Sequence, residues 1–423
     1  MRIARFLTAL LLSLCCGCRA PEDHTERIQW QYLWDTDDPI ERIAESNSHR
    51  GLPNHGAILT PPVVGQDGTV YLLRPHEFSE PKGLSLVAVG PTRQWEIRAA
   101  GSVCNSPAVA DDGTIVFGTG AGLSWAVSPE GKRKWTYSFP ANSFSPPIDY
   151  GGGSTGPARS PACSQPAVAA DGTSYWIGHG VYALAKDGLP RWASEQGEDF
   201  VFVSIAADGT VYALANGGVF AIAPDGKERW KFTLPKSKYF AGGIAIGNDG
   251  TVYLTTLIDG DSALTVLTPH GDTRQRYQAG SGIFVIGKTL IAADGTVYVT
   301  KNIMNQTYAM ALDSHGQAKW TGPQESKTLN IASDGTLYIC DVHDLVAIGR
   351  RGRILWRAKL PEDPNEPEAY SPTKAVTLGP GGKFYIGDFF GRLGTLDNSV
   401  RIATTGWPVR FHDARNTSRA GAN

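Results

Sequence analysis

The chain of 423 residues lacks several features that would assign it to a common functional class. It has no run of roughly 18 apolar residues, so no mature segment is long enough to span a membrane as a helix. Its formal net charge of −2 provides no general basic field for binding nucleic acid. Its nine histidines are scattered singly, without metal-site spacing, and no G-x-S-x-G nucleophile motif occurs. The sequence therefore predicts no metal site and no catalytic residue.

Glycine and aromatic residues, by contrast, are abundant. The chain contains 49 glycines, and Phe, Trp and Tyr together make up 10% of it. This mix is typical of many turns between aromatic strands rather than of helices or disorder. The stretch from Asp208 to Trp230 shows how these residues are ordered. Its pairs Asp208-Gly209 and Asp225-Gly226 predict tight turns, because glycine adopts positive φ readily and aspartate tolerates it.

Short runs of β-branched, aromatic and aliphatic residues lie on either side of these turns. They cover residues 201–206, 210–214, 219–223 and 227–233, and none of them has a helical period. Four short antiparallel strands in about 40 residues predict one blade of a β-propeller.

The Asp-Gly-Thr turn recurs along the chain. Its seven copies begin at Asp67, Asp112, Asp171, Asp208, Asp249, Asp294 and Asp334. A degenerate eighth copy is Gly381-Gly382-Lys383. Self-similarity at about 40 to 45 residues, with four strands in each unit, is the signature of a propeller. Eight copies predict eight blades.

An aromatic residue closes each unit. These residues are Trp95, Trp135, Trp192, Trp230, Tyr277, Trp320 and Trp356. A further copy around Trp30 precedes the first unit, and residues 375–396 supply the inner strands of the last one. We therefore predict an all-β fold, an eight-bladed β-propeller of four-stranded antiparallel blades, whose ring is closed by an N-terminal outer strand. Pairing these ends removes exposed sheet edges; residues 400–404 compete for the same outer position.

Propeller topology places both kinds of Asp-Gly turn on one face and the irregular loops on the other. Loops on a rigid scaffold commonly carry binding sites, so the loop-rich face is the predicted binding face. Its candidate residues are His76, Asp149, Tyr150, His179, Tyr239, Glu366, Glu368, Tyr370, Asp388 and Phe389. In the alternative interpretation, this variation between loops has no function.

Cys104 and Cys163 occupy equivalent positions, each eight residues before the turn aspartate of its unit. Equivalent inner-strand positions of adjacent blades come close near the axis, which makes a disulfide geometrically feasible. Two free buried thiols or a metal site are the alternatives. Cys340 follows a strand-like run and is expected to be a small core residue.

The N-terminus has a positive start, a short apolar run and the sequence Leu14-Cys15-Cys16-Gly17-Cys18. It resembles a bacterial lipoprotein signal. The resemblance implies that Cys18 is lipidated and, because Arg19 rather than aspartate follows it, that the protein is sorted to the outer membrane. The alternative is an ordinary secretory signal. The expected organisation is a signal peptide (1–17), a tether (18–26), the propeller (27–413) and a C-terminal tail (414–423).

The repeat D-G-T-V-Y followed by a closing Trp resembles the quinoprotein-type, PQQ-like propeller repeat. Quinone-dependent members of this fold carry adjacent cysteines over the cofactor. The only such pair here, Cys15-Cys16, lies in the signal segment, so no cofactor is expected. The chain is also similar in plan to the propeller lipoprotein of the outer-membrane β-barrel assembly machinery, although no contact residues can be transferred from it.

This similarity implies a monomeric, non-enzymatic scaffold that is anchored in the cell envelope and binds envelope proteins. The alternative is a glycan- or small-molecule-binding protein, or a hydrolase or lyase, that uses the channel mouth on the same face. Its polar and stacking groups would be Asp149, Tyr150, Glu366, Glu368, Tyr370 and Asp388.

Overall fold

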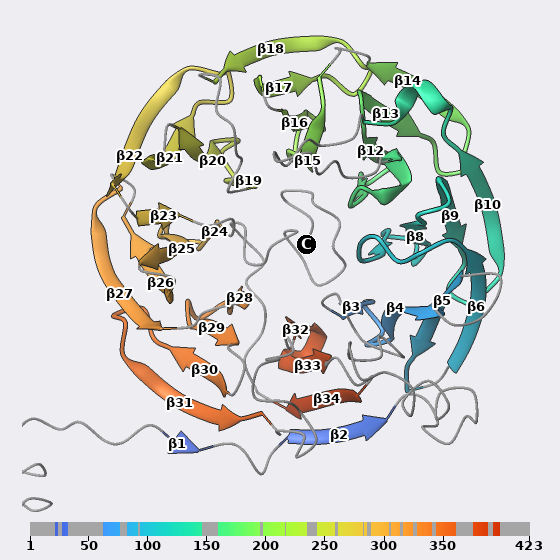
Figure 1. Ribbon diagram of the computed structural model, residues 1–423. Helices are drawn as coiled ribbons and strands as arrows, with labels where there is room; N and C mark the ends of the chain where they lie inside the picture. Colours follow the sequence, from blue (N-terminus) through green and yellow to red (C-terminus); the bar gives the residue numbers. More distant parts are fainter. Residues whose placement is uncertain are drawn as a thin grey trace, which may run out of the picture.

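The computed structural model describes the chain in segments. These are residues 22–23, 28–32, 62–76, 83–91, 94–145, 160–194, 198–215, 217–234, 243–258, 261–281, 283–285, 289–303, 306–313, 316–324, 328–340, 344–360, 375–387 and 392–397. Together they form an all-β, eight-bladed propeller whose blades surround a central axis (Figure 1). The predicted fold class is confirmed.

The first four blades follow the chain in order, each with its strands running from the axis outward. Blade 1 contains β3 (Val63–Val64), β4 (Val70–His76), β5 (Gly83–Val89) and β6 (Gln94–Ala100). Blade 2 contains β7 (Ala108–Val109), β8 (Ile115–Gly118), β9 (Leu123–Val127) and β10 (Arg133–Ser138). Blade 3 contains β11 (Ala167–Val168), β12 (Ser174–Ile177), β13 (Val181–Leu184) and β14 (Pro190–Ser194). Blade 4 contains β15 (Phe200–Ile205), β16 (Val211–Ala215), β17 (Gly218–Ile222) and β18 (Glu228–Thr233).

The remaining blades keep this order, but two of them depart from four strands. Blade 5 contains β19 (Ile244–Ile246), β20 (Val252–Ile258), β21 (Asp261–Leu267) and β22 (Thr273–Ser281). Blade 6 contains β23 (Ile283–Val285), β24 (Leu290–Ile291), β25 (Val297–Ile303), β26 (Gln306–Leu312) and β27 (Ala318–Gln324). Blade 7 contains β28 (Thr328–Ile331), β29 (Leu337–Cys340), β30 (Asp344–Ile348), β31 (Ile354–Lys359) and, at its outer edge, β1 (Glu22–Asp23). Blade 8 contains β32 (Ala375–Leu378), β33 (Lys383–Gly387), β34 (Arg392–Asp397) and β2 (Ile28–Tyr32).

The Asp-Gly-Thr sequence forms the turn between the two inner strands for a local reason. In blade 4, the Thr210 backbone N–H donates to Asp208 Oδ1 at 2.9 Å and the Thr210 hydroxyl donates to Asp208 Oδ2 at 2.7 Å. Gly209 takes a φ of +80°, which a β-carbon would disfavour. The same backbone bond from Thr to Asp recurs in the first seven blades. Each copy is therefore a self-contained turn.

The closing tryptophans join each blade to the next. Trp230 of β18 donates its indole N–H to the carbonyl of Pro269 in blade 5, at 2.9 Å. A β-carbon on Gly271 would lie 2.8 Å from the Trp230 ring, so glycine leaves room for the indole as well as for its own φ of +89°. Equivalent bonds tie Trp95, Trp135, Trp192 and Trp320 to the following blades. These tryptophans therefore have a structural role between blades.

The ring closes as predicted. β2 pairs antiparallel with β34, with Trp30 opposite Gly394. Blades 8 and 1 are also joined at the axis, where the Thr377 hydroxyl donates to the carbonyl of Pro62 at 2.7 Å. The competing segment, residues 400–404, lies outside the described residues. Within the predicted tether, β1 adds a short parallel strand to β31.

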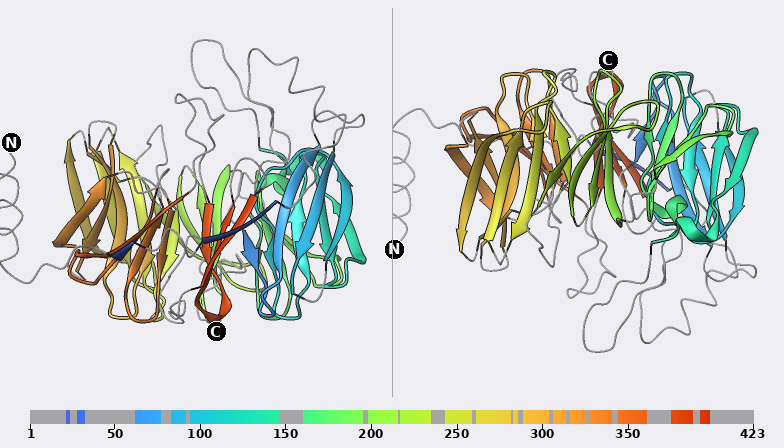
Figure 2. Two further views of the ribbon diagram at one scale, coloured as in Figure 1. Left: turned by 90° about the horizontal axis from the view of Figure 1, so that it is seen from below. Right: turned by 90° about the horizontal axis from the view of Figure 1, so that it is seen from above.

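The two faces of the ring carry different connections (Figure 2). We call the face that carries the Asp-Gly turns the turn face, and the opposite face, which carries the connections between blades, the loop-rich face. The core lies between them and consists of apolar side chains of neighbouring blades, with Tyr212, Leu254 and Ile339 among its buried members. No helix in the described part of the chain is long and apolar enough to cross a membrane.

Candidate binding face

Most candidate residues of the predicted binding face lie outside the described part of the chain. Those residues are Asp149, Tyr150, Tyr239, Glu366, Glu368, Tyr370, Asp388 and Phe389. For His76, only the backbone is described. It is the last residue of β4. His179 is described in full and lies on the loop-rich face of blade 3, between β12 and β13. The loop-rich face is therefore described most completely at blades 2 to 4.

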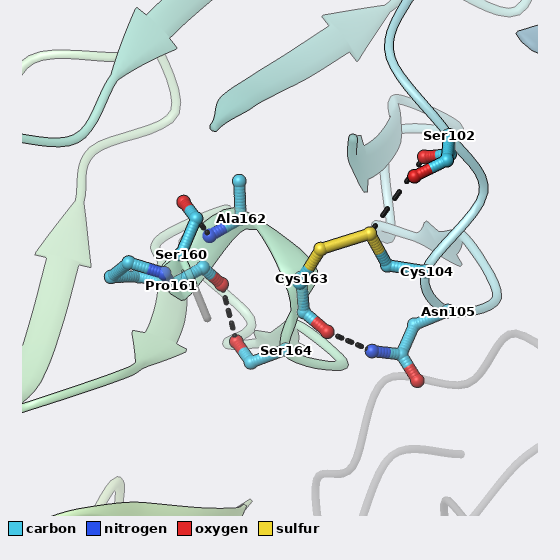
Figure 3. The surroundings of a disulfide bond; sticks show 8 residues. All are labelled: Ser102, Cys104, Asn105, Ser160, Pro161, Ala162, Cys163 and Ser164. Carbon is cyan, nitrogen blue, oxygen red and sulfur yellow. Dashed lines mark hydrogen bonds between the residues drawn. A yellow bond between two sulfur atoms is a disulfide. The ribbon is translucent and has the colours of Figure 1, made fainter. Parts of the chain in front are cut away.

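The inner ends of blades 2 and 3 are joined by a disulfide between Cys104 and Cys163 (Figure 3). The two sulfur atoms are 2.07 Å apart and the two Cα atoms 5.0 Å apart. The side-chain amide of Asn105 donates to the backbone carbonyl of Cys163, which adds a second link between these blades. Of the three alternatives that the sequence left open, the structure has the disulfide.

A short 3-10 turn, η3 (Pro161–Cys163), presents Cys163 to blade 2. Ser160 caps this turn, because its hydroxyl accepts from the Ala162 backbone N–H at 3.2 Å. The Ser164 hydroxyl donates to the carbonyl of Pro161 at 2.7 Å (Figure 3). The backbone that leads into β11 is therefore held by its own side chains and by the disulfide.

A cavity of about 190 Å³ opens beside this linkage. Its lining comes from Asn105 before β7, the connection between blades 2 and 3, the end of β12 and the start of β15, which all lie on the loop-rich face. The lining residues are Asn105, Ser145, Ser160, Cys163, Ser164, Gln165, Ile177, Phe200, Val201 and Phe202. We call this set the blade 2–4 pocket. It combines small polar groups on one side with an apolar wall on the other.

Two lining residues are unusual for a folded surface. Both polar atoms of the Gln165 carboxamide are buried and have no hydrogen-bond partner among the described residues. Buried polar groups are normally paired, because an unpaired one costs about 1–3 kcal/mol. Val201 is one of the few large apolar residues that remain exposed, at 38%. The pocket thus carries an unpaired amide and an uncovered apolar group together.

Two polar side-chain pairs involve Glu198 and Asp199, the residues directly before β15. His179 Nδ1 lies 3.2 Å from Asp199 Oδ1, and the backbone N–H of His179 donates to the carbonyl of Ser143 at 2.9 Å. Lys231 Nζ lies 3.2 Å from Glu198 Oε1 and 4.4 Å from the centre of the Phe220 ring. These contacts link the residues before β15 to blade 3 and to the outer strand β18.

A second cavity, of about 540 Å³, lies on the turn face between blades 4 and 5. Its charged groups are already engaged: Arg229 contacts Asp208 at 2.9 Å and Thr210 at 2.6 Å, and Trp230 donates to Pro269. Similar contacts recur on other blades, such as those of Arg191 with Asp171 and Thr173. Although this cavity is larger, its groups hold the repeat together, so the blade 2–4 pocket is the better candidate site.

The turn face also shifts the pKa values of its titratable groups. Burial raises the pKa of the Asp208 carboxyl, but hydrogen bonds from Thr210 and Arg229 outweigh it, so this pKa lies below its usual value. Asp112, Asp171, Asp249 and Asp294 are shifted in the same direction. Burial raises the pKa values of Tyr175, Tyr212 and Tyr298 to about 12. These shifts follow from the repeated structure of the blades.

Among the described residues, no group of three or more His, Cys, Asp or Glu side chains is arranged to hold a metal ion. Cys340 is buried in β29 and forms no disulfide, in agreement with its predicted place in the core.

Sequence reasoning missed most of the pocket. It singled out Cys104, Cys163 and His179, but not Gln165, Val201 or Asp199. One signal was available: Gln165 lies two residues after Cys163 and two residues before the inner strand β11. Nothing in the sequence indicated that Val201 would be exposed, because a valine in a β-rich run is normally predicted to be a core residue.

Comparison with known proteins agrees with this architecture. Residues 207–407 match the family described as "Outer membrane protein assembly factor BamB". The crystal structure of BamB from Moraxella catarrhalis has a TM-score of 0.53 and 14% sequence identity, and the match covers 79% of this chain and 98% of that one. The Dos1 propeller has a TM-score of 0.55 and 9% identity, and the match covers 82% and 94% of the two chains.

At such low identities, these structural likenesses show the fold alone. No curated protein matches the chain significantly. The structure shows an eight-bladed β-propeller with a repeated Asp-Gly-Thr turn and closing Trp, and residues 207–407 of it are similar to the BamB family.

Proposed function

We propose that the protein is a non-enzymatic scaffold of the bacterial cell envelope that binds a protein partner on its loop-rich face, at the blade 2–4 pocket. The family description of an outer membrane protein assembly factor supports the envelope setting. The N-terminal resemblance to a lipoprotein signal, with Cys18 as the lipidated residue, supports an anchor in the outer membrane.

One observation carries the choice of site: the pocket places an unpaired buried amide beside an exposed apolar side chain. Gln165 brings an unpaired donor and acceptor, and Val201 brings exposed apolar surface. Protein interfaces combine an apolar centre with hydrogen bonds at about one per 100–200 Å². A partner that covers Val201 and offers an amide to Gln165 would satisfy both residues at once.

The rigidity of the pocket supports the same proposal. The disulfide and the capped η3 turn hold its rim. A rigid binding surface loses little conformational entropy when a partner docks, which favours affinity.

The proposal is tested by capture of partners from envelope membranes with the lipidated protein as bait. We expect Val201→Glu to reduce the recovered partner by about tenfold or more, because it places a charge in an apolar contact. The matched control is Leu189→Glu, which changes an exposed leucine of the turn face that is 64% accessible, and it should leave recovery unchanged. Equal loss in both variants would contradict the site.

The Cys18→Ser variant tests the anchor separately. We expect it to leave the membrane fraction while it keeps its fold, which circular dichroism will verify. If the native protein captures no partner but binds a small molecule or glycan tightly, the scaffold function is wrong and the alternative ligand-binding function takes its place.

A further inference from the structure

The N-terminal segment reaches the propeller from a defined side. β1 runs parallel to β31, with Glu22 opposite Trp356 and Asp23 opposite Arg357. β31 begins at Ile354, directly after the turn of blade 7 on the turn face. Because the two strands are parallel, the chain before Glu22 comes from the turn face.

β2 gives the same direction independently. It pairs antiparallel with β34, and its first residue, Ile28, lies opposite Leu396, near the end of β34 that points to the turn face. Both described pieces of the N-terminal segment therefore begin at the turn face, at neighbouring blades 7 and 8 (Figure 1).

The distance to the proposed anchor is short. Three residues separate Cys18 from Glu22. Four steps along the chain span at most about 14 Å, even when fully extended. If Cys18 is lipidated, the turn-face corner of blade 7 must lie close to the surface of the bilayer.

That corner has the composition of a membrane contact. The turn of blade 7 reads Arg350-Arg351-Gly352-Arg353, and its three arginine residues are exposed. Arg350 also donates to the carbonyl of Asp334 at 2.8 Å and lies 4.0 Å from the Asp294 carboxylate. Leu355, two residues further, is one of the few exposed large apolar residues and is 44% accessible. A basic cluster beside one lipid chain is a recognised pair of signals for stable attachment to anionic membranes.

We infer that the turn-face corner of blade 7, formed by Arg350, Arg351, Arg353 and Leu355, rests on an anionic lipid surface. The loop-rich face then points away from the membrane. This inference rests on the lipid anchor of the proposed function. It identifies the partner of the blade 2–4 pocket as a water-exposed protein region rather than a membrane-embedded one.

Position on the membrane can be measured with a fluorophore on a single introduced cysteine. In the lipidated protein, the thiol of Cys18 is blocked, Cys104 and Cys163 are bonded and Cys340 is buried, so the added thiol is labelled selectively. The three labelled variants are Leu355→Cys, Leu189→Cys on the turn face of blade 3, and Val201→Cys on the loop-rich face. The quencher is a nitroxide attached to lipid headgroups in phosphatidylglycerol-containing vesicles.

We expect quenching to be strongest for Leu355→Cys and weakest for Val201→Cys, by about threefold or more, because headgroup quenchers act only near the surface. Equal quenching at these two positions, or stronger quenching at Val201, would overturn the inference. Leu189→Cys reports the tilt of the ring: it is quenched strongly if the turn face lies flat and weakly if blade 7 alone touches the membrane.

The charge contribution is tested with an unlipidated chain that begins at Arg19. The double variant Arg351→Glu with Arg353→Glu should bind phosphatidylglycerol vesicles about tenfold or more weakly, and added salt should reduce the difference. The matched control, Lys132→Glu with Lys186→Glu, reverses two exposed lysines in the turns of blades 2 and 3 and should bind as the parent does. Equal weakening in both double variants would overturn the assigned contact.

Failure of the anchor and failure of the orientation are distinguishable. If the native protein does not float with vesicles, lipidation of Cys18 is wrong. The same three labels are then measured on a chain that carries a hexahistidine tag in place of Cys18 and is bound to nickel-chelating lipid. Stronger quenching at position 355 there supports the orientation on its own, and equal quenching refutes it. Partner capture depends on neither result.

Discussion

The turn face between blades 4 and 5 and the loop-rich face at blades 2 to 4 treat their polar groups in opposite ways. On the turn face, Asp208 is bonded to Thr210 and Arg229, and Asp249 to Thr251 with Arg274 nearby. On the loop-rich face, the carboxamide of Gln165 has no partner among the described residues. At blades 4 and 5 the turn-face charges are paired within the chain, whereas at blades 2 to 4 the loop-rich face leaves a buried amide without a partner among the described residues.

The difference shows how a repeat protein separates stability from function. The Asp-Gly-Thr turn and the closing Trp are copied from blade to blade, so their contacts stabilise the ring wherever they occur. The disulfide between blades 2 and 3, the η3 turn and the exposed Val201, by contrast, are not repeated in the other described blades. Departures from the repeat therefore indicate where a partner is engaged, and four predictions test this separation.

The largest expected effect comes from the joint between blades. Trp230→Ala should lower the free energy of unfolding by about 3 kcal/mol, because it removes a large packed ring and its bond to Pro269. Denaturant unfolding measures this change. The control Leu189→Ala alters an exposed side chain and should change stability by less than about 0.5 kcal/mol. If the folded Trp230→Ala protein captures less partner at the loop-rich face, the two faces are not separate.

The disulfide contributes to the stability of the protein and also lies beside the blade 2–4 pocket. Cys104→Ser combined with Cys163→Ser should cost about 2–4 kcal/mol, because the bond closes a loop between residues 59 apart. Unfolding with and without reductant supplies the control: reductant should destabilise the native protein by a similar amount and leave the double variant unchanged. A reductant effect in the double variant would show that another thiol is responsible.

High pH should lower the free energy of unfolding, because buried tyrosines resist ionisation in the folded protein. The folded pKa of Tyr212 is about 12 against an ordinary 10, so its contribution is fully present below pH 10 and is lost as pH rises through 12. At pH 11 the free energy of unfolding should be lower by about 1 kcal/mol for each such tyrosine. Tyr212→Phe should remove its share of this loss in thermal unfolding followed from pH 9 to 12. An unchanged slope in that variant would contradict the role of Tyr212.

The smallest effect concerns the turn carboxylates, which are largely solvent-exposed. The folded pKa of Asp208 is lowered, so its contribution is present above an unfolded value of 3.8 and is lost as pH falls through the folded pKa. Asp208→Asn should cost about 0.5 kcal/mol at pH 7, because exposed pairs are screened by solvent. The cost should vanish at low pH. A cost that persists at pH 2 would mean that the carboxylate charge is not what stabilises the turn.

Most of the fold could be predicted because its causes are local. Asp208 and Gly209 form a turn from their own side chain and backbone, and the same letters recur at a fixed spacing. The ring closure could also be predicted from the sequence. Trp30 lies in a copy of the outer-strand motif that precedes the first complete repeat, and this strand pairs with the last blade. Blade 6, whose inner edge is split between β23 and β24, and the extra β1 strand have no such motif.

The candidate site could be predicted far less well, because it is assembled from segments that are distant in the sequence. Asn105, Gln165 and Phe200 meet only when blades 2, 3 and 4 are packed side by side. The sequence alone does not distinguish a glutamine whose amide is solvated from one whose amide is buried and unpaired.

The sequence by itself determined the number of blades, their order, the turn chemistry and the aromatic joints, since each of these depends on residues within one repeat or on its period. Only the tertiary structure decided which loop residues share a pocket, which polar groups remain unpaired and from which face the N-terminal segment departs. Those properties depend on the packing of neighbouring blades and on the direction of strand pairing, which no single repeat contains.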